Sequence, residues 1–237
     1  MSDDLFATIR SLWTIPPESP LAELLPRDAE TLRDFYPRLR DYVSRAPRVR
    51  AGAIDPAAIV QGDIISMGEG STIEAGAIVH SSCRLVLGAR SSVRAGALLR
   101  DEVVVGDDCL VGAHCEVVRS VLVGPGTLLG HFIYLADSIV GRDVNIAGNV
   151  WVANTTIKGS TAGTIPIAFR GEKIDSGRTH LGMLAGDGVR FGASTTVCPG
   201  CIVLPGLQLP PSVTLYGTID AARRHALMKH FFKTWVE

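Results

Sequence analysis

"LGARSSVRAGALLRDEVVVGDDCLVGAHCEVVRSVLVGPGTLLGHFIYL", residues 87–135, carries the same kind of side chain at every sixth position. Leucine or valine stands at nine successive positions of this series: Leu87, Val93, Leu99, Val105, Val111, Val117, Val123, Leu129 and Leu135. A period of six fits neither an α-helix nor a plain strand, but it is typical of short strands joined by turns into a coil. We therefore predict an all-β fold, a parallel β-helix of hexapeptide repeats.

The position two residues before each aliphatic residue supports this prediction, because residues two apart share one face of a strand. These positions hold mostly small side chains, which we expect to point inward: Ser91, Ala97, Val103, Cys109, Cys115, Val121 and Thr127. Glycine often follows the aliphatic residue, as at Gly88, Gly106, Gly112, Gly124 and Gly130, where it suits a tight bend. The spacing recurs before and after this stretch, so we expect the coil to cover residues 51–217.

Four of the five cysteines, Cys83, Cys109, Cys115 and Cys201, fall in the small inward position, and we interpret them as apolar fillers. "CPGC" at 198–201 resembles a redox CxxC motif, but no βαβ pattern surrounds it. No spacing typical of metal ligands stands out, so we expect no metal cofactor.

The two ends of the chain and one internal segment do not repeat. Residues 1–50 have helical spacing in their second half, and residues 218–237 form a second helical pattern; both are expected to cap open ends of the coil. From about residue 157 to 183 the six-residue rhythm stops, and basic residues such as Lys173 and Arg178 gather there. This inserted loop is either a solvated excursion or a substrate-facing segment, and its local positive charge favours the second.

Charge and hydropathy narrow the range of partners. Lys and Arg number 23 against 24 Asp and Glu, so no overall field would attract nucleic acid or a membrane surface. No apolar run reaches the roughly 20 residues that span a bilayer, and the N-terminus lacks the pattern of a signal peptide. We expect a cytoplasmic protein that binds neither nucleic acid nor membranes.

Two further stretches resemble a known enzyme family. "GHFIYLADSIVGRDVNIAGNVWVAN" (130–154) is similar to the acetyltransferase domain of bifunctional N-acetylglucosamine-1-phosphate uridyltransferase/glucosamine-1-phosphate acetyltransferases. "KIDSGRTHLGMLAGDGVRFGAS" (173–194) resembles archaeal-type sugar-phosphate nucleotidylyltransferases that carry this domain. The resemblance covers roughly residues 54–210. It implies a left-handed β-helix of triangular section, a homotrimer, and acetyl-coenzyme A as co-substrate between neighbouring coils.

The resemblance also assigns roles to single residues. The catalytic histidine of the family falls on His131, its substrate-contacting tyrosine on Tyr134, its two asparagines on Asn145 and Asn154, and a sugar-phosphate-binding arginine on Arg100. We place Asn154 with His131 as catalytic and the others as substrate-binding.

Two departures from the family pattern concern phosphate binding and nucleotidyl transfer. The chain is one residue longer between Glu116 and His131, so either Val118 or Arg119 replaces a phosphate-binding lysine. A second lysine of the family has no clear match, and Lys173 and Arg178 are candidates for its role. Nothing in residues 1–53 resembles the glycine-rich loop of the nucleotidyl-transfer domain, so that reaction is not expected.

The chemistry of acetyl transfer agrees with these residue types. A histidine can take the proton of an acceptor amine at neutral pH. A backbone N–H near Ala147 and Gly148 can stabilise the tetrahedral oxyanion, and with Ala193 these residues are our candidates for contact with coenzyme A. The predicted function is acetyl transfer to an amino-sugar phosphate or a nucleotide-activated amino sugar. The alternative is a non-catalytic trimeric β-helix that binds sugar phosphates or a partner nucleotidyltransferase, with His131 a corner residue facing solvent.

Overall fold

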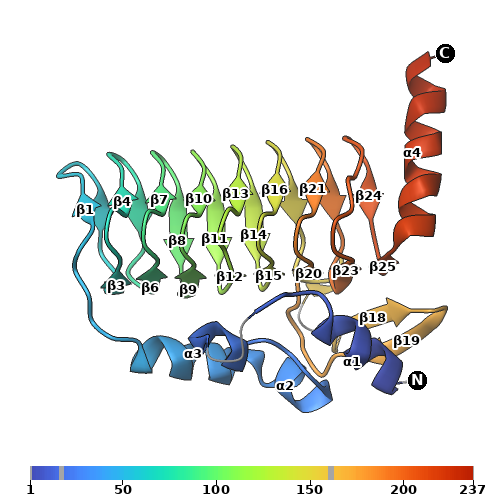
Figure 1. The fold of residues 1–237 in the computed structure, drawn as a ribbon, viewed down its shortest axis with the longest axis horizontal. Helices are drawn as coiled ribbons and strands as arrows, with labels where there is room; N and C mark the ends of the chain where they lie inside the picture. The colour runs from blue at the N-terminus through green and yellow to red at the C-terminus, as the bar shows by residue number, and fades with distance from the viewer. Residues whose placement is uncertain (1, 16–18, 160–162, 237) are drawn as a thin grey trace.

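The computed structural model of the chain describes residues 2–15, 19–159 and 163–236. The chain forms a left-handed parallel β-helix, as predicted, in which three parallel sheets make the three walls of a coil (Figure 1). We call these walls sheets A, B and C, and we name the corners between them by the sheets they join. Each strand pairs in parallel with the strand of the same wall in the coils before and after it.

The strands are short and follow one another around the coil in the order B, C, A. Sheet B contains β1 (Ala53–Ile54), β4 (Thr72–Ile73), β7 (Ser92–Val93), β10 (Leu110–Val111), β13 (Leu128–Leu129), β16 (Asn145–Ile146) and β21 (Arg190–Phe191). Sheet C contains β2 (Ile59–Val60), β5 (Ile78–Val79), β8 (Leu98–Arg100), β11 (Glu116–Val118), β14 (Tyr134–Ala136), β17 (Trp151–Val152), β22 (Thr196–Val197) and β24 (Thr214–Leu215). Sheet A contains β3 (Asp63–Met67), β6 (Arg84–Leu87), β9 (Glu102–Val105), β12 (Val121–Leu122), β15 (Ile139–Val140), β20 (Met183–Ala185), β23 (Cys201–Val203) and β25 (Thr218–Ile219).

The six-residue series of aliphatic side chains fills the interior of the coil, with one exception. Leu87, Leu99 and Leu129, for example, are at most 1% exposed and belong to the central core. The exception is the step at β12, where Leu122 and not Val123 pairs with Val105 of the previous coil. Val121 and Val123 instead face the N-terminal segment in a second apolar cluster.

The cysteines assigned to the inward position are buried, as that assignment requires. Cys83, Cys109, Cys115 and Cys201 are at most 2% exposed and none forms a disulfide. Burial raises the pKa of the Cys83 and Cys109 thiols to about 12, and it raises the pKa of Cys201 further. These thiols therefore stay protonated and act as packing groups.

The glycines that follow the aliphatic residues have a different role from the one predicted. Gly88, Gly106, Gly112 and Gly130 do not have positive φ; of the five, Gly124 alone does. A Cβ atom at Gly112 would lie 1.5 Å from the carbonyl oxygen of Gly130 in the next coil. These positions need glycine because successive coils approach closely there, while the left-handed corner positions are often taken by other residues, including His114 and Phe132.

The N-terminal helices cover a side of the coil and not its open end, so the predicted N-terminal cap is wrong. The segment contains α1 (Ser2–Arg10), η1 (Pro20–Glu23), α2 (Ala29–Arg33) and α3 (Phe35–Arg45), which lie along sheet A (Figure 1). The outward face of sheet A is apolar and packs against these helices through Ile65, Val104, Val121, Ile139, Leu184 and Ile202. The first coil stays open, since Ile54 and Ile59 are 39% and 47% exposed.

The inserted loop and the C-terminal helix complete the fold. Within the insertion, β18 (Pro166–Phe169) and β19 (Glu172–Asp175) form an antiparallel hairpin beside α1, and Ile165, Ile167 and Phe169 are buried in the second apolar cluster. The last helix, α4 (Ala221–Val236), stands at the C-terminal end of the coil, where Leu227 packs against the central core (Figure 1). Among the described residues, no helix combines the length and apolar character needed to cross a membrane.

Candidate active site

His131 lies at the B–C corner, in a column of residues contributed by successive coils. Leu129 pairs with Ile146, and Ile146 pairs with Phe191, so the residues two positions later, His131, Gly148 and Ala193, follow one another along the corner. The His131 side chain is exposed and has no hydrogen-bond partner among the described residues. The catalytic candidate and two coenzyme A candidates thus lie in one row, in which only the histidine has a long side chain.

The backbone of this corner offers one donor group. The Ala147 N–H donates to the Phe191 carbonyl oxygen at 3.1 Å and is therefore engaged. The Gly148 N–H has no acceptor within the described ranges, and a Cβ atom added at Gly148 would meet the His131 carbonyl oxygen at 3.5 Å. Of the two predicted oxyanion donors, Gly148 is thus the one with a free N–H next to the His131 backbone.

Tyr134 and Asn145 flank this column from the two uncovered sheets. Tyr134 begins β14 on sheet C, three residues after His131, and Asn145 begins β16 on sheet B and is exposed. Desolvation by burial raises the pKa of Tyr134, the nearby Glu116 carboxylate raises it further, and Arg100 and Arg119 oppose them. The Tyr134 hydroxyl is therefore a neutral hydrogen-bonding group close to both acidic and basic side chains.

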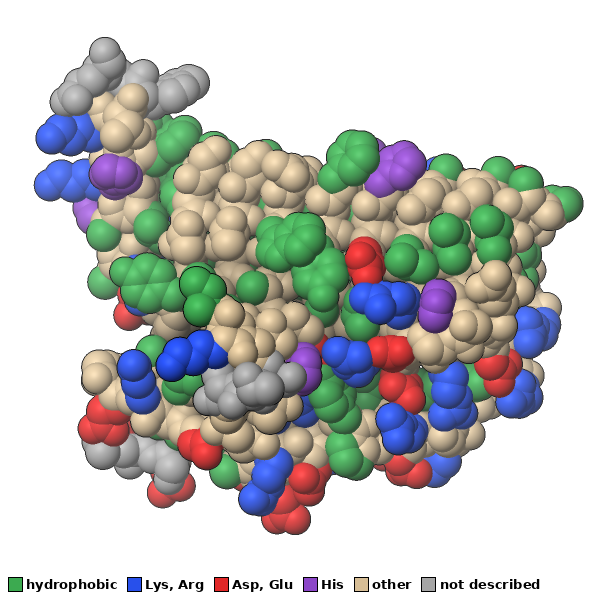
Figure 2. Space-filling model, turned by 180° about the vertical axis from the view of Figure 1, so that it is seen from behind, with side chains coloured by type: hydrophobic (Ala, Val, Ile, Leu, Met, Phe, Trp, Pro, Cys, Tyr) green, Lys and Arg blue, Asp and Glu red, His purple; other side chains and the backbone are tan. Residues whose placement is uncertain are grey.

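The outer face of sheet C carries a charged pair and an aromatic pair side by side. Arg100 Nε donates to Glu116 Oε1 at 2.8 Å. The ring of Tyr134, which is next to Glu116 in register, stacks on Trp151 with centroids 4.5 Å apart. Figure 2 shows hydrophobic side chains next to charged ones across this face, which the N-terminal helices leave uncovered.

A network of charged groups occupies the C–A corner. Arg119 Nε donates to Asp137 Oδ1 at 2.9 Å and to the Tyr36 hydroxyl at 3.0 Å, and the same guanidinium pairs with Asp101. The side chain of Asp137 is 0% exposed and also accepts a hydrogen bond from the Asn154 amide. Arg119 therefore joins the coil to α3, and Asn154 is held by Asp137 in the same network, at the opposite edge of sheet C from His131.

Arg178 extends this network from the insertion to the N-terminal helices. Its guanidinium stacks over the Tyr36 ring, 3.9 Å from the centroid, and its Nε donates to the His180 carbonyl oxygen at 3.0 Å. Burial lowers the pKa of Arg178 to about 10, and it also lowers the pKa of His180. Arg178 is 4% exposed, and its Nη2 has no hydrogen-bond partner in the described part of the chain.

We expect Asp137 to make the folding stability depend on pH. Burial raises its pKa to about 6 from 3.8, although Asn154 and Arg178 act to lower it. The folded protein then holds this proton at a higher pH than the unfolded chain does, so the contribution of Asp137 is fully present below about pH 4 and is lost as the pH rises through about 6. Relative to Asp137→Asn, the wild type should gain about 2 kcal/mol of unfolding free energy between pH 7 and pH 4.

Urea unfolding of both proteins across this range measures the difference. Asp143→Asn, which alters an exposed carboxylate paired with Arg190, is the control. A difference between wild type and Asp137→Asn that stays constant with pH would contradict the buried-carboxylate account.

The other predicted residues lie apart from His131. Lys173 is exposed on the hairpin, opposite Ala168, and this hairpin packs beside sheet A. The sequence did not identify three residues that line sheet C and the C–A corner: Trp151, Asp137 and Tyr36. Trp151 carried a usable signal, because a tryptophan at an outward strand position of a repeat that is otherwise poor in aromatics is unusual.

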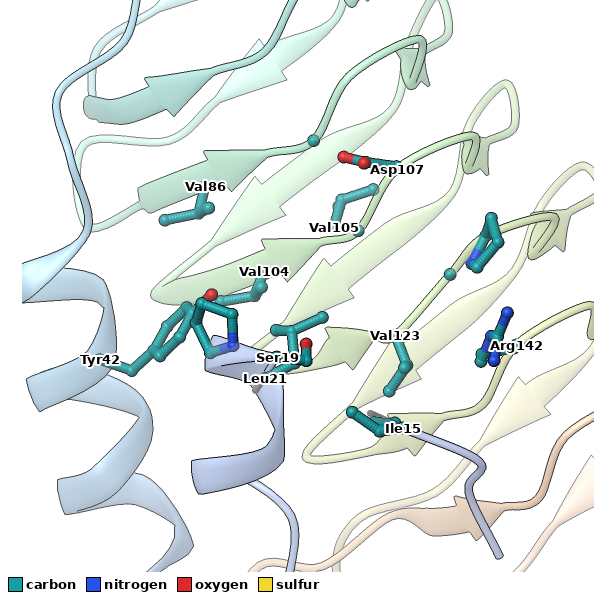
Figure 3. A pocket seen from close by; sticks show the side chains of 15 residues that line it. Ile15, Ser19, Leu21, Tyr42, Val86, Val104, Val105, Asp107, Val123 and Arg142 are labelled. Atoms are coloured by element: carbon teal, nitrogen blue, oxygen red, sulfur yellow. The ribbon is translucent and has the colours of Figure 1, made fainter. Parts of the chain in front are cut away.

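A pocket lies elsewhere, between the N-terminal segment and the A–B corner (Figure 3). It has a volume of about 420 Å³, with Tyr42 and Leu21 on one side and Val104 and Val123 on the other. None of the predicted site residues lines it. It is a gap between the helical segment and sheet A, on the opposite side of the coil from His131.

Comparison with known proteins finds curated bifunctional enzymes that are similar to part of this chain. A bifunctional sugar-1-phosphate nucleotidylyltransferase/acetyltransferase from Sulfurisphaera tokodaii is 31% identical over 102 residues, which are 43% of this chain and 24% of that protein. The bifunctional protein GlmU of Burkholderia thailandensis is 30% identical over 148 residues, 56% of this chain and 32% of that protein. The chain is similar to bifunctional nucleotidylyltransferase/acetyltransferases. This confirms the resemblance predicted from the sequence.

The match to the bifunctional nucleotidylyltransferase/acetyltransferases is partial. The chain spans about a quarter to a third of the length of these two relatives. No protein-family model matches the chain. Among solved structures, the polysialic acid O-acetyltransferase OatWY aligns over 73% of this chain and 80% of its own with a TM-score of 0.37 and 15% identity. PerB from Caulobacter crescentus, in complex with CoA and GDP-perosamine, aligns over 74% and 56% with a TM-score of 0.25 and 20% identity.

Proposed function

We propose that the chain transfers an acetyl group from acetyl-coenzyme A to the amine of an amino-sugar phosphate or a nucleotide-activated amino sugar. The observation that supports this most is the row of His131, Gly148 and Ala193 along the B–C corner, with Tyr134 and Asn145 beside it. The small residues after His131 leave room along the corner for an extended acyl carrier. Sheets B and C, which flank this corner, are free of the N-terminal helices.

In the proposed reaction, the acceptor nitrogen attacks the thioester carbonyl carbon while the His131 imidazole takes a proton from that nitrogen. The Gly148 N–H donates a hydrogen bond to the oxyanion of the tetrahedral intermediate. Collapse of the intermediate breaks the carbon–sulfur bond, and the imidazolium returns the proton to the departing thiolate. The products are the N-acetylated sugar and free coenzyme A, and no metal is required for the balance.

The phosphate of the acceptor needs cationic partners, and the candidates differ in availability. Arg100 lies on the open face of sheet C with a single carboxylate partner, Glu116, so it is our first candidate. Arg119 is bound to Asp101 and Asp137, and Arg178 is buried against Tyr36, so both would have to exchange existing contacts. Lys173 would reach a phosphate only if the acceptor extended toward the hairpin.

A homotrimer is part of this proposal. Asn154, the second catalytic candidate, is held by Asp137 at the C–A corner, across sheet C from His131. In a trimer with parallel coils, the C–A corner of one copy can lie beside the B–C corner of its neighbour and bring the two residues into one site.

The alternative, a non-catalytic module, draws support from the same corner. Arg119, one of the two candidates for the place of a phosphate-binding lysine, pairs with two carboxylates and with the Tyr36 hydroxyl, so it serves the attachment of α3. Asn154 is engaged by Asp137. Such a module would bind a sugar phosphate on sheet C without catalysing a reaction of it.

Ligand-induced stabilisation and thiol release test the proposal. A ligand that binds only the folded state raises the free energy of unfolding, by about 2.7 kcal/mol when its concentration is a hundred times Kd. The melting temperature rises accordingly. We expect millimolar coenzyme A to raise the melting temperature and glucosamine-1-phosphate or a nucleotide-activated amino sugar to trigger thiol release from acetyl-coenzyme A. Stabilisation by sugar phosphates without any response to coenzyme A would favour the non-catalytic module.

A further inference from the structure

Trp151 is an exposed tryptophan on sheet C, a wall of the coil that no other element of the described chain covers. The residue is 56% exposed, although it lies in β17, an interior strand of sheet C. Its register neighbours on the two sides are Tyr134 and Thr196. With Tyr134, on which it stacks, Trp151 forms an exposed aromatic surface, and a contiguous apolar surface of this kind can serve as a ligand-binding face.

The geometry leaves one face of the indole open. Tyr134 covers one face, with the two rings inclined by 19° and centroids 4.5 Å apart. On the other side, the next two coils present only short exposed side chains, Thr196 and then Thr214. A flat ring placed above these threonines would continue the stack that Tyr134 and Trp151 begin, and the threonine hydroxyls could bond to its edge.

The surroundings of the aromatic pair are suited to a phosphorylated ligand. On the other side of Tyr134 lies Glu116, which holds the guanidinium of Arg100 on the same face. Figure 2 shows hydrophobic side chains at the centre of this face with basic and acidic groups next to them. Arg100 and the open face of Trp151 lie on opposite sides of Tyr134, so the two would contact separate parts of the bound ligands.

We propose that Trp151, backed by Tyr134, is a stacking platform for a nucleobase. This inference rests on the proposed function in one respect. The reacting sugar must lie within reach of His131, which precedes Trp151 by one coil. The ring on the open face of Trp151 is therefore a different part of the ligand. Bases stack on aromatic side chains irrespective of sequence, since each base has a flat π-face. The base comes either from a nucleotide-activated acceptor sugar or from the adenine of coenzyme A.

Nucleotide titrations of the full chain, followed by calorimetry and by tryptophan fluorescence, test the platform without requiring turnover. The probes are UDP, GDP and dTDP for the activated sugar, and adenosine 3′,5′-bisphosphate for coenzyme A. Stacking should quench the emission of Trp151, one of three tryptophans in the chain. We expect Trp151→Leu to weaken binding of the recognised nucleotide at least tenfold, equivalent to about 1.4 kcal/mol, and Trp151→Phe to keep it within about threefold.

A matched control removes another exposed aromatic ring. Phe232→Leu alters a residue that is 50% exposed on α4, away from sheet C, and it should leave nucleotide binding unchanged. Tight binding of a nucleoside diphosphate assigns the base to the acceptor, and preferential binding of the adenosine bisphosphate assigns it to coenzyme A; either result supports the platform.

Three results would overturn the inference: no binding of any nucleotide, equal binding by Trp151→Leu and wild type, or an equal loss for glucosamine-1-phosphate, which has no base. A fall in molar mass of Trp151→Leu in light scattering would also overturn it, because Trp151 would then serve an interface between copies. The proposed function has a separate test: nucleotide binding without any thiol release would contradict acetyl transfer and leave the stacking platform standing.

Discussion

His131→Ala should lower the rate of acetyl transfer by about 100- to 10,000-fold, the usual contribution of a general base. The loss should appear in kcat, because the imidazole acts on the reacting nitrogen and makes few contacts with the rest of the acceptor. The melting temperature should barely change, since the side chain is exposed and has no hydrogen-bond partner among the described residues. Thiol release with glucosamine-1-phosphate, or with the acceptor that proves active, measures the effect.

His114→Ala is a close control for this variant. His114 is also exposed at the B–C corner, one coil earlier, where its ring stacks on Phe132 with centroids 5.1 Å apart. The general-base assignment predicts nearly normal turnover for His114→Ala. Comparable activities for His131→Ala and wild type, with both proteins folded, would exclude His131 as the base.

Gly112→Ala should destabilise the protein by about 4 kcal/mol or more, enough to prevent folding of many domains. The added methyl group would lie 1.5 Å from the Gly130 carbonyl oxygen and 2.5 Å from that of Leu129. Both obstacles are backbone atoms of the next coil, so no side-chain rotation can relieve the overlap and neighbouring coils must separate. Chemical denaturation of the soluble variant measures the loss of stability. If the variant does not fold, it will be absent from the soluble fraction.

Gly148→Ala provides the comparison, because it makes the same change at the same corner two coils later. There the nearest atoms to an added Cβ are His131 O at 3.5 Å and His131 N at 4.0 Å, which are ordinary contacts. We expect a change in stability below about 1 kcal/mol. Similar losses for the two variants would show that conformational freedom, and not the approach of the coils, explains the glycine at position 112.

The repeat allowed much of the coil to be predicted because its interior is set by local spacing. Inward-pointing strand residues recur after a fixed number of residues along the chain. Aliphatic side chains with this spacing, such as Leu99, Val111 and Leu129, therefore identify the core. The prediction went wrong at Val121 and Val123, where the frame shifts by one residue and the inward position falls to Leu122.

The position of the N-terminal helices was misjudged although the sequence contained a signal for it. Several strands of sheet A contain apolar runs, for instance "VVV" at 103–105 and "CIV" at 201–203, and their outward residues Val104 and Ile202 are buried. Continuous apolar runs are typical of strands that are buried on both faces. A covering layer on sheet A could have been predicted, but which segment supplies it could not.

The candidate site divides in the same way. The resemblance to the acetyltransferase family, matched by offsets along the chain, selected His131, Tyr134 and Asn145, which the fold brings to one corner. The offsets did not indicate that Arg119 and Arg178 are occupied by Asp137 and Tyr36, because these partners are far away in the sequence.

The sequence by itself determined the coil, most of its inward residues and the corner that carries His131, since each depends on neighbours a few bonds away. Only the tertiary structure decided that Gly112 is fixed by the coil above it, that Arg178 stacks on a helix about 140 residues earlier, and that Trp151 shows an open face beside Tyr134. These features arise where distant segments meet, and the distance between two such segments is set by packing and not by the order of residues.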